Sequence, residues 1–137
     1  RKGKYAAIKR AMKFVDTPIV IFSDANTMIN QEAIRKIIPH YNDAGTGGVA
    51  GEKKIIVNKH SSAVGEGEGL YWKYESLMKK LDARLYTVIG AAGELFSMRT
   101  ELFREFPDDL IIDDFVISMH ICVQGYKIAY EPHAYAA

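Results

Sequence analysis

The chain has 137 residues, of which 48% are hydrophobic and 26% charged, and this composition predicts one globular domain while excluding an intrinsically disordered chain. Its 18 basic and 17 acidic side chains leave a formal net charge of +1, so no global field favours nucleic acid as a partner, and phosphate binding must come from a local site. The apolar runs are shorter than the ~20 residues of a membrane-spanning helix, so we expect the chain as given to be soluble.

The first part of the chain alternates helix and strand signals. Residues 5–15 carry apolar side chains at three- and four-residue intervals with basic ones between them, which predicts an amphipathic helix. Pro18 ends that pattern, and the continuous apolar run at residues 19–22 predicts a strand buried on both faces of a parallel sheet. A second helix is predicted at residues 31–41, with four apolar residues facing inward: Ala33, Ile34, Ile37 and Ile38.

The second part continues the alternation. Residues 48–57 are predicted to be extended, and residues 66–85 are predicted to form a long helix with apolar residues at helical spacing. Packing in the core explains its aromatic residues Tyr71, Trp72 and Tyr74, and a binding site is the competing explanation. Strands alternating with helices predict an α/β fold with a mostly parallel sheet flanked by helices, in a single domain of residues 1–137. The remaining predicted elements are a strand at 95–98, a helix at 99–106, a helix at 113–124 and a strand at 126–130.

Asp24 and Asn26 follow the first predicted strand, at the edge of an α/β sheet where ligands bind. Two oxygen-bearing side chains two residues apart suit one Mg²⁺ or Mn²⁺ ion, whose remaining ligands are usually substrate phosphates. A helix N-cap or a turn explains the same residues, because Asp and Asn favour both places. The tripeptide alone leaves both interpretations open.

Four carboxylates, Asp108, Asp109, Asp113 and Asp114, stand at the approach to the predicted helix at 113–124. Acidic residues near a helix N-terminus are favoured by the macrodipole, which is one explanation of the cluster. Asp113 and Asp114 are embedded in apolar residues, however, and a partly desolvated carboxylate also suits a general base. Spacing alone does not decide between these explanations.

The small residues of the loop from Gly90 through Gly93 to Glu94 would let a substrate approach the backbone closely. A simple tight turn is the competing interpretation. The position of the loop in the sequence, between Asp24 and the pair Asp113 and Asp114, favours the substrate-binding interpretation.

Taken in order, these segments resemble the family 2 glycosyltransferases, and the resemblance covers nearly the whole chain. It implies the GT-A fold, a Rossmann-like nucleotide-binding α/β sheet, and a reaction that transfers a sugar from a nucleotide diphosphate donor with inversion at the anomeric centre. The matching segments are Gly3-Lys4, Ile21 to Asn26, Gly90 to Glu94 with Phe96 and Arg99, Asp113-Asp114, Gly125-Tyr126 and Tyr130-Glu131-Pro132.

The resemblance implies a role for each carboxylate. Asp24 matches the first Asp of the family's D-x-D motif, which holds Mg²⁺ or Mn²⁺ on the donor diphosphate, and Asn26 stands where a second Asp is usual. Asp114 matches the general base that takes the proton of the acceptor hydroxyl. Asp113 is its structural or acceptor-binding neighbour. His133 lies near the place where some GT-A enzymes bring a histidine to the metal, and an exposed loop histidine is the competing explanation.

The resemblance also implies the substrate contacts. Lys4 matches a lysine at the edge of the nucleotide site, and Gly90, Gly93 and Glu94 match the loop that borders the donor sugar and the acceptor. The implied partners are a nucleotide diphosphate sugar and a glycan or lipid acceptor.

The chain departs from the family in lacking a match to the N-terminal strands that grip the nucleobase and to the later Gln-x-x-Arg-Trp motif. We therefore expect the central and C-terminal part of a catalytic domain, whose parent works at the cytoplasmic face and is anchored to a membrane. The missing strands would lie beside residues 19–22, so we expect homo-oligomers through an exposed sheet edge. A non-catalytic nucleotide- or sugar-binding module is the alternative function.

Overall fold

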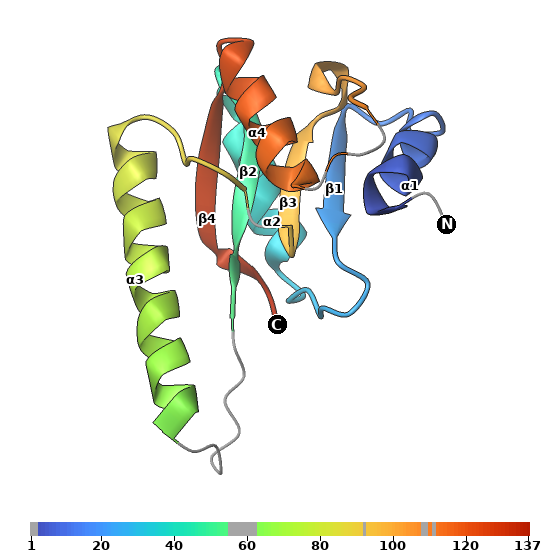
Figure 1. Cartoon of the computed structure of the whole chain (residues 1–137). Helices are drawn as coiled ribbons and strands as arrows, with labels where there is room; N and C mark the ends of the chain where they lie inside the picture. The colour runs from blue at the N-terminus through green and yellow to red at the C-terminus, as the bar shows by residue number, and fades with distance from the viewer. Residues whose placement is uncertain (1–2, 55–62, 92, 108–109, 111) are drawn as a thin grey trace.

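The computed structural model describes residues 3–54, 63–91, 93–107, 110 and 112–137, with the backbone alone for residues 63–70. Four α-helices, two short 3₁₀ helices and four strands follow one another in these residues (Figure 1). The helices are α1 (Gly3–Met12), α2 (Ala33–Ile37), η1 (Ile38–Asn42), α3 (Ala63–Leu85), η2 (Thr100–Leu102) and α4 (Asp113–Val123). The strands are β1 (Ile19–Ser23), β2 (Thr46–Lys53), β3 (Leu95–Arg99) and β4 (Lys127–Ala136).

The four strands form one sheet in the order β1-β3-β2-β4. The expected α/β fold with helices flanking a sheet is confirmed, but the sheet is mixed rather than mostly parallel. β3 runs antiparallel to both β1 and β2, and only β2 and β4 pair in parallel. The apolar run at residues 19–22 correctly indicated a strand, but its residues are half-buried rather than buried because β1 is an end strand. The direction of a strand depends on its partner, which is distant in sequence.

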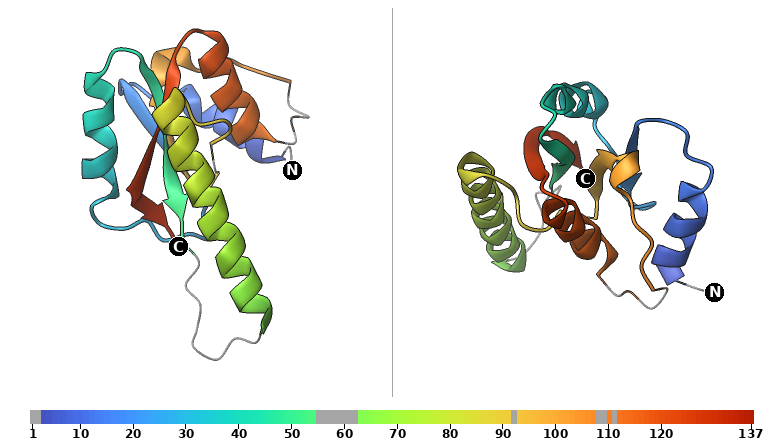
Figure 2. Two further views of the ribbon diagram at one scale, coloured as in Figure 1. Left: turned by 90° about the vertical axis from the view of Figure 1, so that its left-hand side faces the viewer. Right: turned by 90° about the horizontal axis from the view of Figure 1, so that it is seen from above.

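Helices cover both faces of the sheet, which gives three layers (Figure 2). α1, α3 and α4 lie on one face, and α2 with η1 lies on the other. Neighbouring strand residues point to opposite faces, so that Val49 and Leu95 join the core under α2 while Ala50 and Phe96 join the core under α1 and α4. The sheet thus has one hydrophobic core on each face. The helix α1 lies beside β1, at that end of the sheet (Figure 1).

Two predicted helices are shorter than expected. The helix predicted at 31–41 is α-helical only as α2 and continues as the 3₁₀ helix η1, because Pro39 cannot donate the backbone hydrogen bond that an α-helix needs. Ile34 and Ile38, expected inside, are 58% and 41% exposed, and only Ala33 and Ile37 are buried. The helix predicted at 99–106 is reduced to η2.

The apolar stripe of α3 does not pack in the core, and this prediction was wrong. Tyr71 and Tyr74 are 61% and 62% exposed, while Trp72 is half-buried. Figure 1 shows α3 standing beside the sheet, with its N-terminal end extending past the strands. Periodicity correctly indicated a helix but could not tell which neighbour covers its apolar side. No helix in the described part of the chain is both long and apolar enough to cross a membrane.

β1 is an end strand of the sheet, and in the described residues it pairs along one side only, with β3. An unpaired edge is a template for pairing with another chain. We therefore predict that the isolated chain forms dimers or larger assemblies at micromolar concentration. Light scattering coupled to size exclusion measures the mass directly, and dilution should dissociate the assemblies. Monomers at every concentration would contradict the prediction.

Candidate active site

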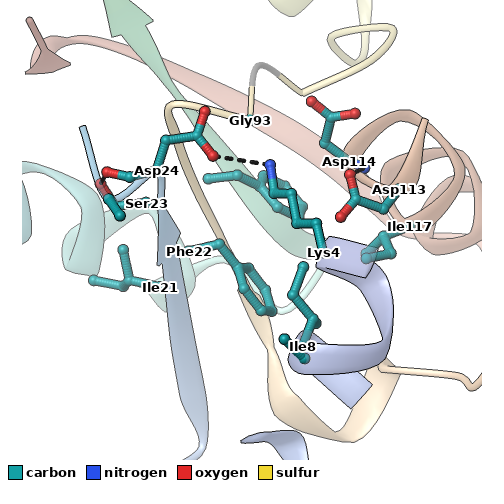
Figure 3. A pocket seen from close by; sticks show the side chains of 13 residues that line it. Lys4, Ile8, Ile21, Phe22, Ser23, Asp24, Gly93, Asp113, Asp114 and Ile117 are labelled. Atoms are coloured by element: carbon teal, nitrogen blue, oxygen red, sulfur yellow. Dashed lines mark hydrogen bonds and ion pairs between the residues drawn. The ribbon is translucent and has the colours of Figure 1, made fainter. Parts of the chain in front are cut away.

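A pocket of 470 Å³ opens where the carboxyl end of β1, the start of α1 and the start of α4 meet. We call it the central pocket. β1 ends at Ser23, so Asp24 projects from the strand end, which is the place where α/β sheets bind ligands. Figure 3 shows Asp24 on one side and Asp113 and Asp114 on the other. The lining residues are Lys4, Ala7, Ile8, Ile21, Phe22, Ser23, Asp24, Ala25, Gly93, Phe96, Asp113, Asp114 and Ile117.

Lys4 reaches from the first turn of α1 into the pocket between these carboxylates (Figure 3). Its Nζ donates a hydrogen bond to Asp24 Oδ1 over 2.9 Å, and the two side chains are 54% and 33% exposed. The hydrogen bond to Asp24 raises the pKa of Lys4 above its usual 10.5, and the charges of Asp113 and Asp114 add to this effect. The pair therefore contributes its stability at neutral pH and loses it as pH rises through the raised pKa. Because the pair is solvent-exposed, that contribution is at most about 1 kcal/mol.

Asp113 and Asp114 occupy the first turn of α4, and each uses one oxygen locally. Asp113 Oδ1 accepts the Asp114 N–H over 3.1 Å, and Asp114 Oδ1 accepts the Phe115 N–H over 2.8 Å. Both carboxylates therefore stabilise the start of α4, as one of the two explanations of the acidic cluster predicts. Asp113 is nevertheless only 6% exposed, and its Oδ2 is buried without a hydrogen-bond partner among the described residues. An unsatisfied buried acceptor is costly, and the helix-start explanation does not account for this one.

Gly93 brings the loop backbone against both charged groups. A Cβ at this position would lie 2.7 Å from Asp114 Oδ2 and 3.3 Å from Lys4 Nζ. Any side chain larger than hydrogen would therefore displace the Asp114 carboxylate. Gly93 fits the expectation of a close backbone approach, and it is needed where the carboxylate of α4 and the amine of α1 converge.

Asp114 also lines a second, smaller hollow of 310 Å³ on the α3 side of the loop, which we call the side hollow. Gly90 lies in its wall with a positive φ of 75°, and a Cβ there would lie 3.0 Å from the Phe115 ring. The side hollow also exposes Glu75 and Asp82 of α3. Asp114 is thus reached from two sides, from the central pocket and from the side hollow.

Glu94 does not line the central pocket. Its carboxylate forms an ion pair with Lys53 at the end of β2, and the Lys53 Nζ lies 4.7 Å from the centre of the Trp72 ring. Glu94 therefore stabilises the connection between the loop, β2 and α3. Lys53 was absent from the sequence-based candidates, although its position at the carboxyl end of a strand was a usable signal.

The other candidates are not gathered in the central pocket. Asn26 is exposed in the turn after Asp24 and is not part of the lining. His133 lines a hollow on the α3 side, together with Lys53 and Trp72, and not the pocket of Asp24. Asp108 and Asp109 lie outside the described residues. The apolar wall formed by Ile8, Phe22 and Ile117 was not anticipated, because it assembles from three separate elements.

The residues present suit a divalent metal held mainly by its substrate. Among the described residues, no group of three or more His, Cys, Asp and Glu side chains converges as a metal cage. Asp24 supplies one hard oxygen ligand at the pocket wall, and Mg²⁺ or Mn²⁺ bound through one or two carboxylates completes its shell with phosphates and water. The arrangement fits that mode of binding and does not fit a closed structural metal site.

The chain is similar to known proteins in sequence and in fold. No protein-family model matches the chain. The chain is 28% identical over 142 residues to the poly-beta-1,6-N-acetyl-D-glucosamine synthase of Staphylococcus aureus, with the same values for strains COL and MRSA252. The match covers 97% of the chain and 33% of the synthase, so the chain spans about a third of its relatives' length.

The fold is also found among solved structures. A mannosyltransferase from Pyrobaculum calidifontis, in complex with GDP-Man and Mn²⁺, superposes with a TM-score of 0.80 at 19% identity, covering 99% of the chain and 36% of that protein. At this level of identity, the likeness establishes the fold alone. The fold in question is that of a protein which binds a nucleotide sugar together with a divalent metal.

Proposed function

Because the chain is related in sequence to a family 2 glycosyltransferase and has the GT-A fold, we propose that it transfers a sugar from a nucleotide diphosphate donor to an acceptor hydroxyl, with inversion. One observation carries this proposal. Asp24 and Asp114, ninety positions apart in the sequence, line the same pocket, with the Lys4 amine bound to the first and close to the second. The pocket therefore offers a positively charged amine to the donor diphosphate and a carboxylate to the acceptor hydroxyl.

The donor diphosphate would bind at the Asp24 side of the pocket. Lys4 can transfer its hydrogen bond from Asp24 to a phosphate oxygen, because its side chain is half-exposed and its ammonium is charged. Asp24 would hold Mg²⁺ or Mn²⁺, which neutralises charge on the leaving diphosphate when it is bound. Lys4 adds a second positive charge at the same place.

Asp114 would act as the general base. One of its oxygens is held by the Phe115 N–H, and the other lies beside Gly93. This second oxygen takes the proton from the acceptor hydroxyl while the acceptor oxygen forms its bond to the anomeric carbon. The bond from that carbon to the diphosphate oxygen breaks, and the nucleoside diphosphate leaves with the electron pair. Attack opposite the leaving group gives inversion.

The acceptor would be a glycan or a lipid-linked glycan. The relative is named as a polysaccharide synthase, and its name specifies N-acetyl-D-glucosamine in β-1,6 linkage. The two hollows that reach Asp114 have volumes of 470 and 310 Å³, which leaves room for an acceptor larger than one sugar. Because nucleotide sugars are made in the cytoplasm, transfer would take place there or at the cytoplasmic face of a membrane.

A nucleotide titration tests the donor site. We expect the full-length gene product to bind GDP or UDP in a Mn²⁺-dependent manner, and Asp24→Ala to weaken this binding by at least about 10-fold because it removes a metal ligand. Isothermal titration with each nucleotide, with and without Mn²⁺, gives the affinities. Asp16→Ala, an exposed carboxylate on the connection before β1, is the matched control and should bind like the wild type. Equal binding by the Asp24 variant would remove Asp24 from the site.

A further inference from the structure

α3 presents an apolar stripe to solvent along its described length. The stripe consists of side chains that are 39% to 86% exposed: Tyr71, Tyr74, Leu77, Met78, Leu81 and Leu85. Residues two positions apart in a helix point in nearly opposite directions, because each residue turns the chain by about 100°. Tyr74, Leu81 and Leu85 therefore face away from the protein, on the side opposite Trp72, Lys79 and Ala83, which face it.

A row of basic residues borders this stripe. Lys73, Lys80 and Arg84 follow one another along α3, one position before Tyr74, Leu81 and Leu85, so they lie beside the stripe on the helix surface. They line a hollow of 990 Å³ between α3, the end of β2 and the middle of β4, which we call the basic hollow.

Lys53, the last residue of β2, and Lys54 after it also line the basic hollow; Lys53 is paired with Glu94, so Lys54 is the further positive charge. Glu52 is the one carboxylate in its described lining, and this side chain is 8% exposed and accepts hydrogen bonds from the Tyr130 and Ser76 hydroxyls. On the other side of the stripe, Glu75 is paired with Lys79 over 2.9 Å. Asp82 also lies on that side, so Lys73, Lys80 and Arg84 outnumber it and the net charge of the described residues beside the stripe is positive.

We propose that the outer side of α3 docks on an anionic lipid bilayer, with the apolar stripe entering the headgroup region and the basic hollow holding lipid phosphates. The proposal goes beyond the sugar transfer and does not depend on it. An interfacial helix combines an apolar face rich in aromatic and leucine residues with Lys and Arg beside it, which is the pattern of α3. The described part of the stripe spans ~21 Å, from Tyr71 to Leu85.

The shape of this surface favours a bilayer over an acidic protein partner. Figures 1 and 2 show α3 along one side of the molecule, and its stripe residues are 39% to 86% exposed, so the stripe projects into solvent. A fluid bilayer adapts to such a surface and offers phosphates beside an apolar layer. Tyr71 and Tyr74 suit this boundary, because tyrosine has an apolar ring and a polar tip.

Vesicle sedimentation tests the proposal. We expect the chain to sediment with vesicles that mix phosphatidylcholine and phosphatidylglycerol, and to bind phosphatidylcholine vesicles much more weakly. The double variant Lys80→Glu, Arg84→Glu should bind the anionic vesicles at least about 30-fold more weakly, since each cation near the surface contributes about a factor of five. Leu77→Ser with Leu81→Ser should also lose binding, because it shortens the stripe.

The matched control reverses two exposed cations on the other face of the sheet, Arg35→Glu with Lys36→Glu, and should leave vesicle binding unchanged. All of these positions are exposed, and circular dichroism checks that the variants are folded. Equal binding to both vesicle types, no binding to either, or an equal loss in the control variant would overturn the proposal. So would a dimer that dissociates on Leu77→Ser with Leu81→Ser, since a second copy would then occupy the stripe. Nucleotide titration is independent of these measurements.

Discussion

Asp114→Asn is expected to lower the rate of sugar transfer by about 10²–10⁴-fold while leaving donor binding close to that of the wild type, because asparagine cannot take a proton. The substitution keeps the size of the side chain, and its amide oxygen can still accept the Phe115 N–H, which lies 2.8 Å from Asp114 Oδ1. The start of α4 should therefore hold. Release of nucleoside diphosphate by the full-length gene product, measured at saturating donor, gives the rate, and titration gives the affinity.

The same measurement separates the two functions that the sequence allowed. A non-catalytic nucleotide- or sugar-binding module would bind its ligand equally well with aspartate or asparagine at position 114, and neither protein would turn over. Asp16→Asn, an exposed carboxylate outside the central pocket, is the control for the loss of one negative charge. Full transfer activity in the Asp114 variant would refute its assignment as the base.

Gly93→Ala is expected to lower transfer by about 10²-fold with little change in stability, because misplacing a catalytic group by about 1 Å costs that much. The new Cβ would lie 2.7 Å from Asp114 Oδ2, so the carboxylate must move. The atom that moves is the end of a side chain, and Gly93 has no positive φ, so the fold can accept the alanine. Thermal unfolding and transfer assays on the same preparation test both halves of the prediction.

Gly45→Ala is the matched control for this prediction. Its new Cβ would lie 3.3 Å from the Asp43 carboxylate, again the end of an aspartate side chain, and Gly45 lies outside the lining of both hollows at Asp114. We expect this variant to keep its activity. If Gly93→Ala also kept full activity, then Asp114 would not need the position that the structure gives it.

Asp114→Asn and Gly93→Ala both test whether catalysis depends on the position and chemistry of the Asp114 carboxylate. Asp114→Asn removes the proton acceptor and leaves its position unchanged, whereas Gly93→Ala keeps the acceptor and moves it. A general base should be sensitive to both changes. A carboxylate that only starts α4 should tolerate Gly93→Ala, because the hydrogen bond to the Phe115 N–H uses the other oxygen.

Sequence periodicity located the helices and strands because it reports which side of a local element avoids water. It placed β1, β3 and α4 within a residue or two of their observed bounds, and it placed Asp24 at a strand end. The ordered motifs also anticipated that Asp24 and Asp114 share a pocket, which is a statement about distant residues. That inference came from the family resemblance, since spacing along the chain carries no information on such a distance.

Local sequence patterns gave wrong predictions wherever burial or strand direction depended on a neighbouring element. Ile34 and the tyrosines of α3 have the spacing of core residues, yet each lies on a side of its helix that no described element covers. β3 lies between β1 and β2 and runs antiparallel to both, and the residue pattern of so short a strand does not indicate its direction. The prediction of a mostly parallel sheet was wrong for this reason.

The sequence by itself determined the fold class, the order of the elements and the acidic residues at the ends of β1 and the start of α4, because these follow from local periodicity, turn residues and recognisable motifs. Only the tertiary structure decided that Lys4 binds Asp24, that Gly93 presses against Asp114, that Glu94 turns to Lys53 and that the stripe of α3 faces solvent. Each of these depends on which elements pack together, because a side chain's neighbours in a folded chain come from segments that are far apart in the sequence.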